Sequence, residues 1–189
     1  TPDDYDYSVI REQVRGWEEY PVIGGGSEPF LRYTELRGMQ RAYLDLAARP
    51  ELVAYGLEKL FSLAHEQTRR IYEQIPGRVD ASYVAEDLGS QEDLLFSPAA
   101  IRRHFLPGMK RMVDLAHEAG VAAFCHSDGA IRRIIPDLLD IGIDVLNPVQ
   151  WRLDCRVVLL PLLEKLHDPR LAVLAPARQG GGHYRQLNG

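Results

Sequence analysis

Short apolar runs alternate along the chain with longer stretches in which apolar and polar residues are mixed. The runs that predict strands are Val79–Ala85, Val121–Cys125 and Ile143–Leu146, and Pro21–Gly26 predicts a short strand that runs into a glycine-rich loop. Apolar runs of this length, bounded by glycine, are typical of strands covered on both faces, as in parallel sheets. The pattern therefore favours a parallel sheet.

The longer stretches have the periodicity of helices. Pro50 suits a first helical turn, Ser97 and Pro98 suit an N-cap followed by a first turn, and Pro107 predicts a kink or a break. The helices expected from the pattern are 35–48, 50–75, 97–120 and a segment that opens with Arg132 and Arg133.

Strands separated by helices form a βαβ series. Such a series fits a small open sheet, or the middle of an eight-stranded barrel of about 250 residues. Periodicity alone leaves both open. The first 20 residues are acidic and aromatic without clear periodicity, so we expect an N-terminal arm at 1–20, a core at 21–176 and a disordered tail at 177–189.

Composition narrows the function classes. The length of 189 residues predicts one domain, and 46% hydrophobic residues allow a sizeable core. A net charge of −5 argues against nucleic acid or an anionic membrane as partner. We also expect no membrane span, no signal peptide, and no disulfide framework from Cys125 and Cys155. These features predict a cytoplasmic protein.

The most informative polar residues follow the third expected strand. In parallel α/β folds the chemistry lies at the carboxyl ends of strands, where His126, Ser127 and Asp128 are found. If the chain stays extended, His126 and Asp128 point the same way, and an imidazole and a carboxylate together can bind a metal or act as an acid–base pair. A hydrogen-bonded pair that fixes a turn explains them equally well.

A second polar cluster, Glu86 and Asp87, follows the second expected strand, Val79–Ala85. Adjacent strand residues point in opposite directions, so at most one of them enters a shared cavity, and Asp87 is in phase with Tyr83. A helix cap or surface loop is the alternative. The glycines Gly24–Gly26 lack the phosphate-loop pattern, and close backbone approach or loop flexibility explains them better. His65, His104 and His117 are expected to be structural.

Several sequence segments match the motifs of a known protein family. They are Tyr83–Gln91, Ser97–Pro98, Ala116–Gly120, His126–Gly129 and Ile135–Gln150, with Pro29–Phe30, Leu36–Gly38, Asp45 and Pro50–Leu52 upstream. The set resembles the uroporphyrinogen decarboxylase domain family over residues 20–150. The resemblance implies an α/β (β/α)8 TIM barrel, incomplete in this chain at about four to five βα units.

The family resemblance implies one of two chemistries. One is decarboxylation of uroporphyrinogen, a tetrapyrrole, without a cofactor. The other is methyl transfer between a corrinoid protein and an acceptor, in which zinc activates a thiol. Zinc-containing members carry a His-x-Cys pair where this chain has His126 and Asp128. Zinc also accepts carboxylate ligands, so these two residues are the expected metal ligands.

The resemblance and the strand-end positions give a full set of expected site residues. Asp87 and His126 are the expected catalytic residues, with Asp87 or Glu86 as a third ligand or substrate contact. The expected substrate-binding residues are Glu86, Gln91, Asn147 and Gln150.

The resemblance favours methyl transfer, with zinc, a corrinoid methyl donor and a corrinoid-protein partner. Decarboxylation is the alternative, but it depends on an Arg-containing motif and an Asp that we expect to precede this chain. A third reading is an inactive binding or assembly module. We do not expect the chain to be active alone.

Beyond Gln150 the resemblance ends. Leu153–Leu166 does not continue as the next βα unit, Leu171–Pro176 resembles a late strand, and the tail from Arg178 is expected to be disordered. Cys155 falls in this region, so the family's later cysteine ligand is not assigned to it. A fragment, a deletion or a shifted reading frame would explain the pattern. An open barrel leaves strand edges unpaired, which predicts aggregation or a homodimer.

Overall fold

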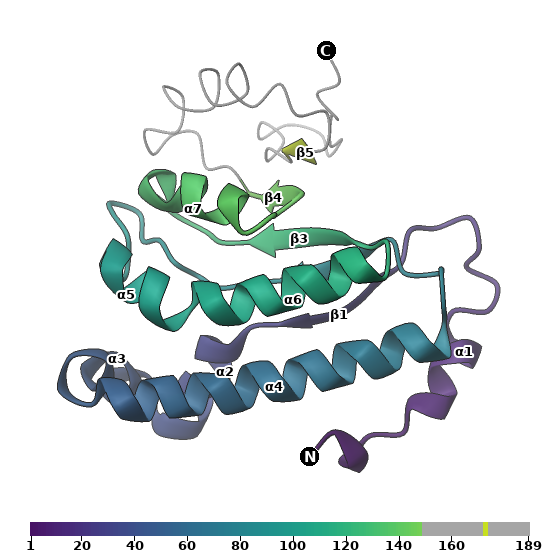
Figure 1. The fold of residues 1–189 in the computed structure, drawn as a ribbon, viewed down its shortest axis with the longest axis horizontal. Helices are drawn as coiled ribbons and strands as arrows, with labels where there is room; N and C mark the ends of the chain where they lie inside the picture. The colour runs from purple at the N-terminus through teal and green to yellow at the C-terminus, as the bar shows by residue number, and fades with distance from the viewer. Residues whose placement is uncertain (149–171, 174–189) are drawn as a thin grey trace.

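The computed structural model describes residues 1–148 and 172–173 of the chain (Figure 1). Two short 3-10 helices and α1 come first, followed by alternating strands and helices. The strands are β1 (Ile23–Ser27), β2 (Ala81–Val84), β3 (Ala122–His126), β4 (Val145–Asn147) and β5 (Ala172–Val173). The helices are η1 (Pro2–Asp4), η2 (Tyr7–Val9), α1 (Ile10–Gln13), α2 (Pro29–Arg37), α3 (Met39–Ala48), α4 (Pro50–Gln74), α5 (Pro98–His104), α6 (Leu106–Glu118), η3 (Arg132–Ile134) and α7 (Ile135–Asp140).

The strands form one five-stranded, fully parallel sheet in the order β1-β2-β3-β4-β5, which is also their order in the chain. Tyr83 is level with Phe124, Phe124 is level with Val145, and His126 is level with Asn147. Each connection carries helices, as parallel crossovers require. This is the winding of a (β/α)8 barrel, and the sheet does not close within the residues that the structure describes.

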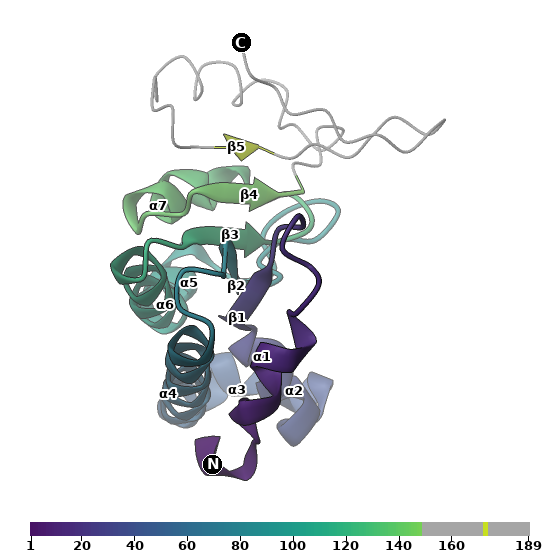
Figure 2. The same ribbon diagram turned by 90° about the vertical axis from the view of Figure 1, so that its right-hand side faces the viewer.

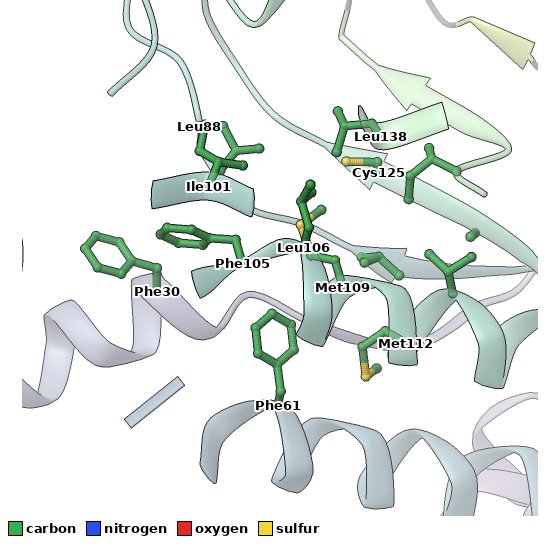
Figure 3. Close-up of a cluster of buried hydrophobic side chains, with 14 of the residues drawn as sticks. Phe30, Phe61, Leu88, Ile101, Phe105, Leu106, Met109, Met112, Cys125 and Leu138 are labelled. Carbon is green, nitrogen blue, oxygen red and sulfur yellow. The ribbon is translucent and has the colours of Figure 1, made fainter. Parts of the chain in front are cut away.

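Helices cover one face of the sheet (Figure 2). The helices α4 and α6 lie along it, and α6 contacts both β2 and β3. Val84, Ala123 and Cys125 are fully buried beneath them. Figure 3 shows the side chains that fill this layer, among them Phe61, Phe105, Met109 and Met112. Burial of each such side chain stabilises the fold by about 1.5–3 kcal/mol.

The opposite face of the sheet is only partly covered. Along β2 and β3 the side chains alternate between buried and half-buried, and Tyr83, Phe124 and His126 belong to the half-buried set. This is the face that a closed barrel would enclose. The alternation directs Tyr83 and His126 to the same side, where their rings stack with centroids 6.0 Å apart.

The prediction of a glycine-rich loop at Gly24–Gly26 is wrong, because these residues lie within β1. A Cβ on Gly26 would lie 2.2 Å from the Tyr83 carbonyl oxygen, and one on Gly25 would lie 2.5 Å from the Thr68 side chain. Thr68 accepts a hydrogen bond from the Gly26 N–H at 2.9 Å. The close backbone approach expected of the glycines is therefore made to β2 and α4.

The prediction of a single helix over 35–48 is also wrong. The chain forms α2 and α3, which are divided at Gly38, where φ is +82°. The apolar residues that suggested the helix are largely exposed, with Leu36 at 78% and Met39 at 67%. The buried face instead carries Phe30, Tyr33, Ala42 and Asp45. Arg37 pairs with the Asp45 carboxylate at 2.6 Å.

Other boundaries are confirmed. The helix α4 begins at Pro50, and the Ser97 hydroxyl accepts the Ala100 N–H as the N-cap of α5. The break expected from Pro107 occurs at Phe105, which separates α5 from α6. Proline lacks an amide hydrogen, so it is tolerated within the first turn of the new helix.

The N-terminal segment lies along α4. Asp3 pairs with Arg70 at 2.7 Å, the Arg70 guanidinium lies 5.5 Å from the Tyr7 ring centroid, and Arg11 donates to the Gln74 carbonyl oxygen. In the part of the chain that is described, no helix is long and apolar enough to cross a membrane. The predictions for Gln150, Cys155, 153–166 and 178–189 fall outside the described residues.

Candidate functional site

Polar side chains gather where the strands end. Glu28 directly follows β1, Asp87 comes shortly after β2, His126 ends β3 and Asn147 ends β4. The carboxyl ends of parallel strands lie at one edge of the sheet, so these residues come from four neighbouring positions on that edge. We call the group the strand-end site, and it comprises Glu28, Tyr83, Asp87, His126, Asp128 and Asn147.

The His126 ring is oriented from two sides. Its Nδ1 lies 3.3 Å from the Asn147 side-chain oxygen. An amide oxygen can only accept a hydrogen bond, so Nδ1 carries the proton and, in the neutral ring, Nε2 presents its lone pair. That Nε2 lies 3.8 Å from the Asp87 Oδ1 atom. The arrangement leaves one imidazole nitrogen and one carboxylate facing each other at the site.

The Asp87 carboxylate is held by the backbone that follows β3. Its Oδ1 accepts a hydrogen bond from the backbone N–H of Asp128 at 3.2 Å. The Asp87 side chain is 56% exposed, so it faces solvent while its neighbour Glu86 is buried. Strand alternation predicts this division between the two adjacent carboxylates.

Tyr83 lies against the His126 ring and is surrounded by carboxylates. Burial raises the pKa of its hydroxyl, and the negative charges of Glu28, Asp87 and Asp128 raise it further. Three carboxylates from three different strand ends therefore act on one phenol. The site therefore has an acidic character.

Glu28 is the site residue that the sequence analysis missed. Burial raises the pKa of its half-buried carboxyl, Asp87 adds to this rise, and His126 and Arg32 oppose it. A signal was present, since Glu28 is the first charged residue after an expected strand. It was hidden because Gly24–Gly26 were assigned to a loop, which moved the expected strand end away from Glu28.

Glu86 lies beneath the site. It is 2% exposed, and its Oε1 accepts a hydrogen bond from the Phe30 N–H at 2.9 Å. Its own N–H donates to the His126 carbonyl oxygen at 3.1 Å. Burial holds the pKa of the Glu86 carboxyl well above its usual range. Glu86 thus ties the start of α2 to the ends of β2 and β3.

Comparison with known proteins identifies the family. The sequence matches the family model named uroporphyrinogen decarboxylase (URO-D) over residues 7–166. The chain belongs to the uroporphyrinogen decarboxylase family. Among solved structures, it is similar to a methyltransferase from Methanosarcina mazei, with a TM-score of 0.63 and 16% sequence identity. The match covers 93% of this chain and 48% of that one. No curated protein matches the sequence.

These comparisons confirm the predicted fold. At 16% identity, the similarity to the methyltransferase shows a shared fold alone. The chain spans about half the length of that methyltransferase, since it covers 48% of it. The open parallel sheet is accordingly part of a barrel of the URO-D family type.

The remaining predicted residues are placed as follows. Gln91 is exposed in the loop after β2, next to Ser90, whose hydroxyl bonds the Asp93 carbonyl oxygen at 2.8 Å. His117 lies 2.7 Å from Asp144 and His104 is half-buried on α5, both outside the strand-end site. His65 is half-buried on α4.

The donors at the site partly fit a metal of the kind found in URO-D family methyltransferases. Two zinc ligands in a tetrahedral site lie about 3.4 Å apart, close to the separation of the His126 and Asp87 donor atoms. Among the residues that the structure describes, no three His, Cys, Asp or Glu side chains form a metal-binding group. Cys125 is fully buried on the helix-covered face of β3, opposite to His126, and burial raises the pKa of its thiol to about 12. The described residues supply a nitrogen–oxygen pair for a metal.

Proposed function

We propose that this chain carries the metal-binding strand ends of a methyltransferase site, which moves a methyl group from a corrinoid carrier to an acceptor thiol. The observation that supports it is the orientation of His126. Its Nδ1 is directed at Asn147, so Nε2 faces Asp87. A neutral histidine fixed in this way through its second nitrogen is the usual arrangement of a metal ligand.

His126 and Asp87 would hold the metal, with Asp128 as the further ligand expected from the sequence. A bound zinc would lower the pKa of the acceptor thiol, so that the thiolate forms near neutral pH. The thiol would release its proton to water as the thiolate forms, and in the transfer the thiolate sulfur would form a bond to the methyl carbon. The electron pair of the carbon–cobalt bond stays with the corrinoid.

The other residues of the chain have supporting roles. Asn147 fixes the tautomer and orientation of His126, and the Asp128 N–H orients the Asp87 carboxylate. Tyr83 stacks on the His126 ring and helps to hold its plane. Each contact holds the side chain of a metal ligand in one orientation. Contacts of this kind, made by residues that surround the ligands, raise the affinity for the metal.

Decarboxylation of a tetrapyrrole is the second candidate. The raised pKa of Glu28 favours it, because a carboxyl that keeps its proton could protonate the carbon left after loss of CO2. The charge of the site opposes it, since Asp87 and Asp128 would repel a substrate that carries several carboxylates. We therefore favour methyl transfer.

Elemental analysis of the purified chain tests the proposal. We expect about one zinc per chain in the original protein and in His65→Ala, and almost none in His126→Ala. His65 is a matched control because it lies on α4, away from the strand ends. Equal metal content in the original protein and His126→Ala would rule out the assignment. A protein without metal but with tetrapyrrole binding would favour decarboxylation, and one with neither would favour an inactive binding module.

A graded variant tests the role of Asn147. Asn147→Ala should bind zinc about 10–100-fold more weakly, because His126 loses the contact that fixes its tautomer. The measurement is competition for zinc with a chromophoric chelator, with Gln91→Ala as the control. An unchanged zinc affinity would show that Asn147 does not orient the ligand.

A further inference from the structure

A cavity of about 660 Å³ opens beside β1 and reaches the strand-end site. The side chains Leu60, Leu63 and Ala64 of α4 form an apolar wall. Glu28 and Tyr83 line the cavity and also belong to the strand-end site, so the cavity adjoins the proposed metal position. The size suits a small ligand.

Two polar groups of this cavity make no side-chain hydrogen bond among the described residues. The Ser27 hydroxyl is buried, lines the cavity and makes no hydrogen bond. The Glu28 carboxyl also lines the cavity, and none of the described hydrogen bonds or ion pairs involves it. By contrast Glu35, on the same cavity, pairs with Arg32 at 2.9 Å. Buried polar groups are normally satisfied, so the Ser27 hydroxyl indicates a ligand that can hydrogen-bond to it, and the half-buried Glu28 carboxyl beside it can contact the same ligand.

The negative charge of the cavity indicates which ligand group fits beside Glu28. The carboxylates of Glu28 and Asp87 belong to the same strand-end site, and Glu28 lines the cavity, so the negative charge at this end of the cavity comes from neighbouring strand ends. The rings of Tyr5 and Tyr83 line the same space. A carboxylate flanked by aromatic rings is a favourable environment for an ammonium group, which gains both an ion pair and cation–π attraction.

We propose that this cavity binds an ammonium group, so that the acceptor of the methyl group is a small aminothiol. The proposal rests on the proposed methyl transfer, and it names the class of acceptor. The ammonium lies between Glu28 and the two tyrosines, the carbon chain lies against Leu60 and Leu63, and the thiol points toward His126 and Asp87. An anionic thiol is disfavoured because Glu28 repels it.

Binding of three thiols of similar size tests the charge preference. The thiols are 2-aminoethanethiol, 2-mercaptoethanol and 2-mercaptoethanesulfonate, titrated into the zinc-loaded chain and followed by NMR. We expect the aminothiol to bind at least about tenfold more tightly than the neutral thiol, and the sulfonate to bind most weakly. Equal affinities, or a preference for the sulfonate, would overturn the proposal.

Matched carboxylate variants locate the ammonium. Glu28→Gln should remove the preference for the aminothiol over the neutral thiol, whereas Glu35→Gln should keep it because Glu35 is already paired with Arg32. Ser27→Ala, a smaller change, should weaken binding without altering the charge preference. If both glutamine variants reduce the preference for the aminothiol equally, the overall surface charge explains that preference. The assignment of the ammonium to Glu28 would then be wrong.

Ethanolamine separates this inference from the proposed function, because it has the ammonium but no sulfur. It should bind equally to the original chain and to His126→Ala. That result, found together with no metal in either protein, would support the ammonium site while the methyl-transfer proposal fails. No binding of ethanolamine to either protein would refute the ammonium site, whatever the metal content.

Discussion

At the scale of single residues, the buried carboxyl of Glu86 couples the strand-end site to pH. Its folded-state pKa is raised by burial, so the folded protein resists its ionisation. A group with a raised folded-state pKa contributes stability that is present below its unfolded-state pKa and is lost as pH rises through the folded value. Glu86 therefore reduces stability on the alkaline side.

Replacement of Glu86 tests this linkage. Glu86→Gln keeps an oxygen that can accept the Phe30 N–H but cannot ionise. Above neutral pH the variant should be more stable than the original chain, by roughly 1–3 kcal/mol, because no buried charge forms. Below the ordinary glutamate pKa the two should be equal. Urea unfolding over a pH series measures the difference, and a difference that does not vary with pH would contradict the explanation.

The affinity of the cavity beside Glu28 for an ammonium ligand should also depend on pH. The raised pKa of Glu28 means that its carboxyl gains a proton at a higher pH than usual. Ethanolamine affinity should therefore fall as pH is lowered through this raised pKa, while the ligand itself stays charged. NMR titration at several pH values measures it. A flat profile in the original chain, identical to that of Glu28→Gln, would show that Glu28 does not contact the ammonium.

At the scale of single residues, sequence reasoning located part of the site. Asp87, His126 and Asn147 follow apolar runs directly, so strand-end logic finds them. Glu28 was missed because a strand made of glycines has no apolar pattern. The contacts of Glu86 with Phe30 and His126 join residues far apart in the chain, which no local pattern encodes.

At the scale of helices and strands, the contact between α4 and α6 depends on one missing side chain. Gly108 lies in the first turn of α6, where a Cβ would come within 2.1 Å of the Phe61 ring. Phe61 is 2% exposed and has little room to move. The approach of the two helices is therefore set by glycine, although glycine is a poor helix former.

Gly108→Ala tests this contact. Helix propensity alone predicts a gain of about 1 kcal/mol, but overpacking should outweigh it and lower the free energy of unfolding by about 1–3 kcal/mol. Thermal or urea unfolding measures the change. Gln40→Ala, on an exposed position of α3, should change it by less than about 0.5 kcal/mol. A stabilised Gly108→Ala would show that α4 and α6 separate at no cost.

Helices whose apolar residues face the core could be predicted from the sequence. Helices that carry many of their apolar residues on the surface could not. The pattern over Pro50–Gln74 and the Ser97–Pro98 start both match the structure. The helices α2 and α3 were misassigned because Leu36, Met39 and Leu44 are exposed. Apolar residues on a surface follow no core-facing period, so periodicity cannot locate such helices.

At the scale of the whole molecule, the half-buried face of the sheet and the free edge of β1 are the surfaces that a closed barrel would cover. Tyr83, Phe124 and Val145 lie level on that face. An edge strand and a partly exposed apolar face both favour association between chains. The homodimer expected from the sequence stays a prediction.

Sedimentation over a range of concentrations tests this association. We expect the original chain to associate reversibly, and Phe124→Glu to shift the equilibrium at least about tenfold toward the monomer. Leu44→Glu, on the exposed surface of α3, is the control and should leave association unchanged. If Leu44→Glu dissociates the protein and Phe124→Glu does not, the helices form the interface.

The strand order has a consequence for how the chain is made. Because the strands lie in the sheet in the order in which they occur in the chain, each one adds to a neighbour that has already been synthesised. During translation, β2 can dock on β1 once its crossover helices have left the ribosome, and β3 can follow without waiting for distant sequence. A nascent chain of this design assembles from its N-terminal side, and a ribosome that stalls after β3 would still hold a layered, partly folded sheet.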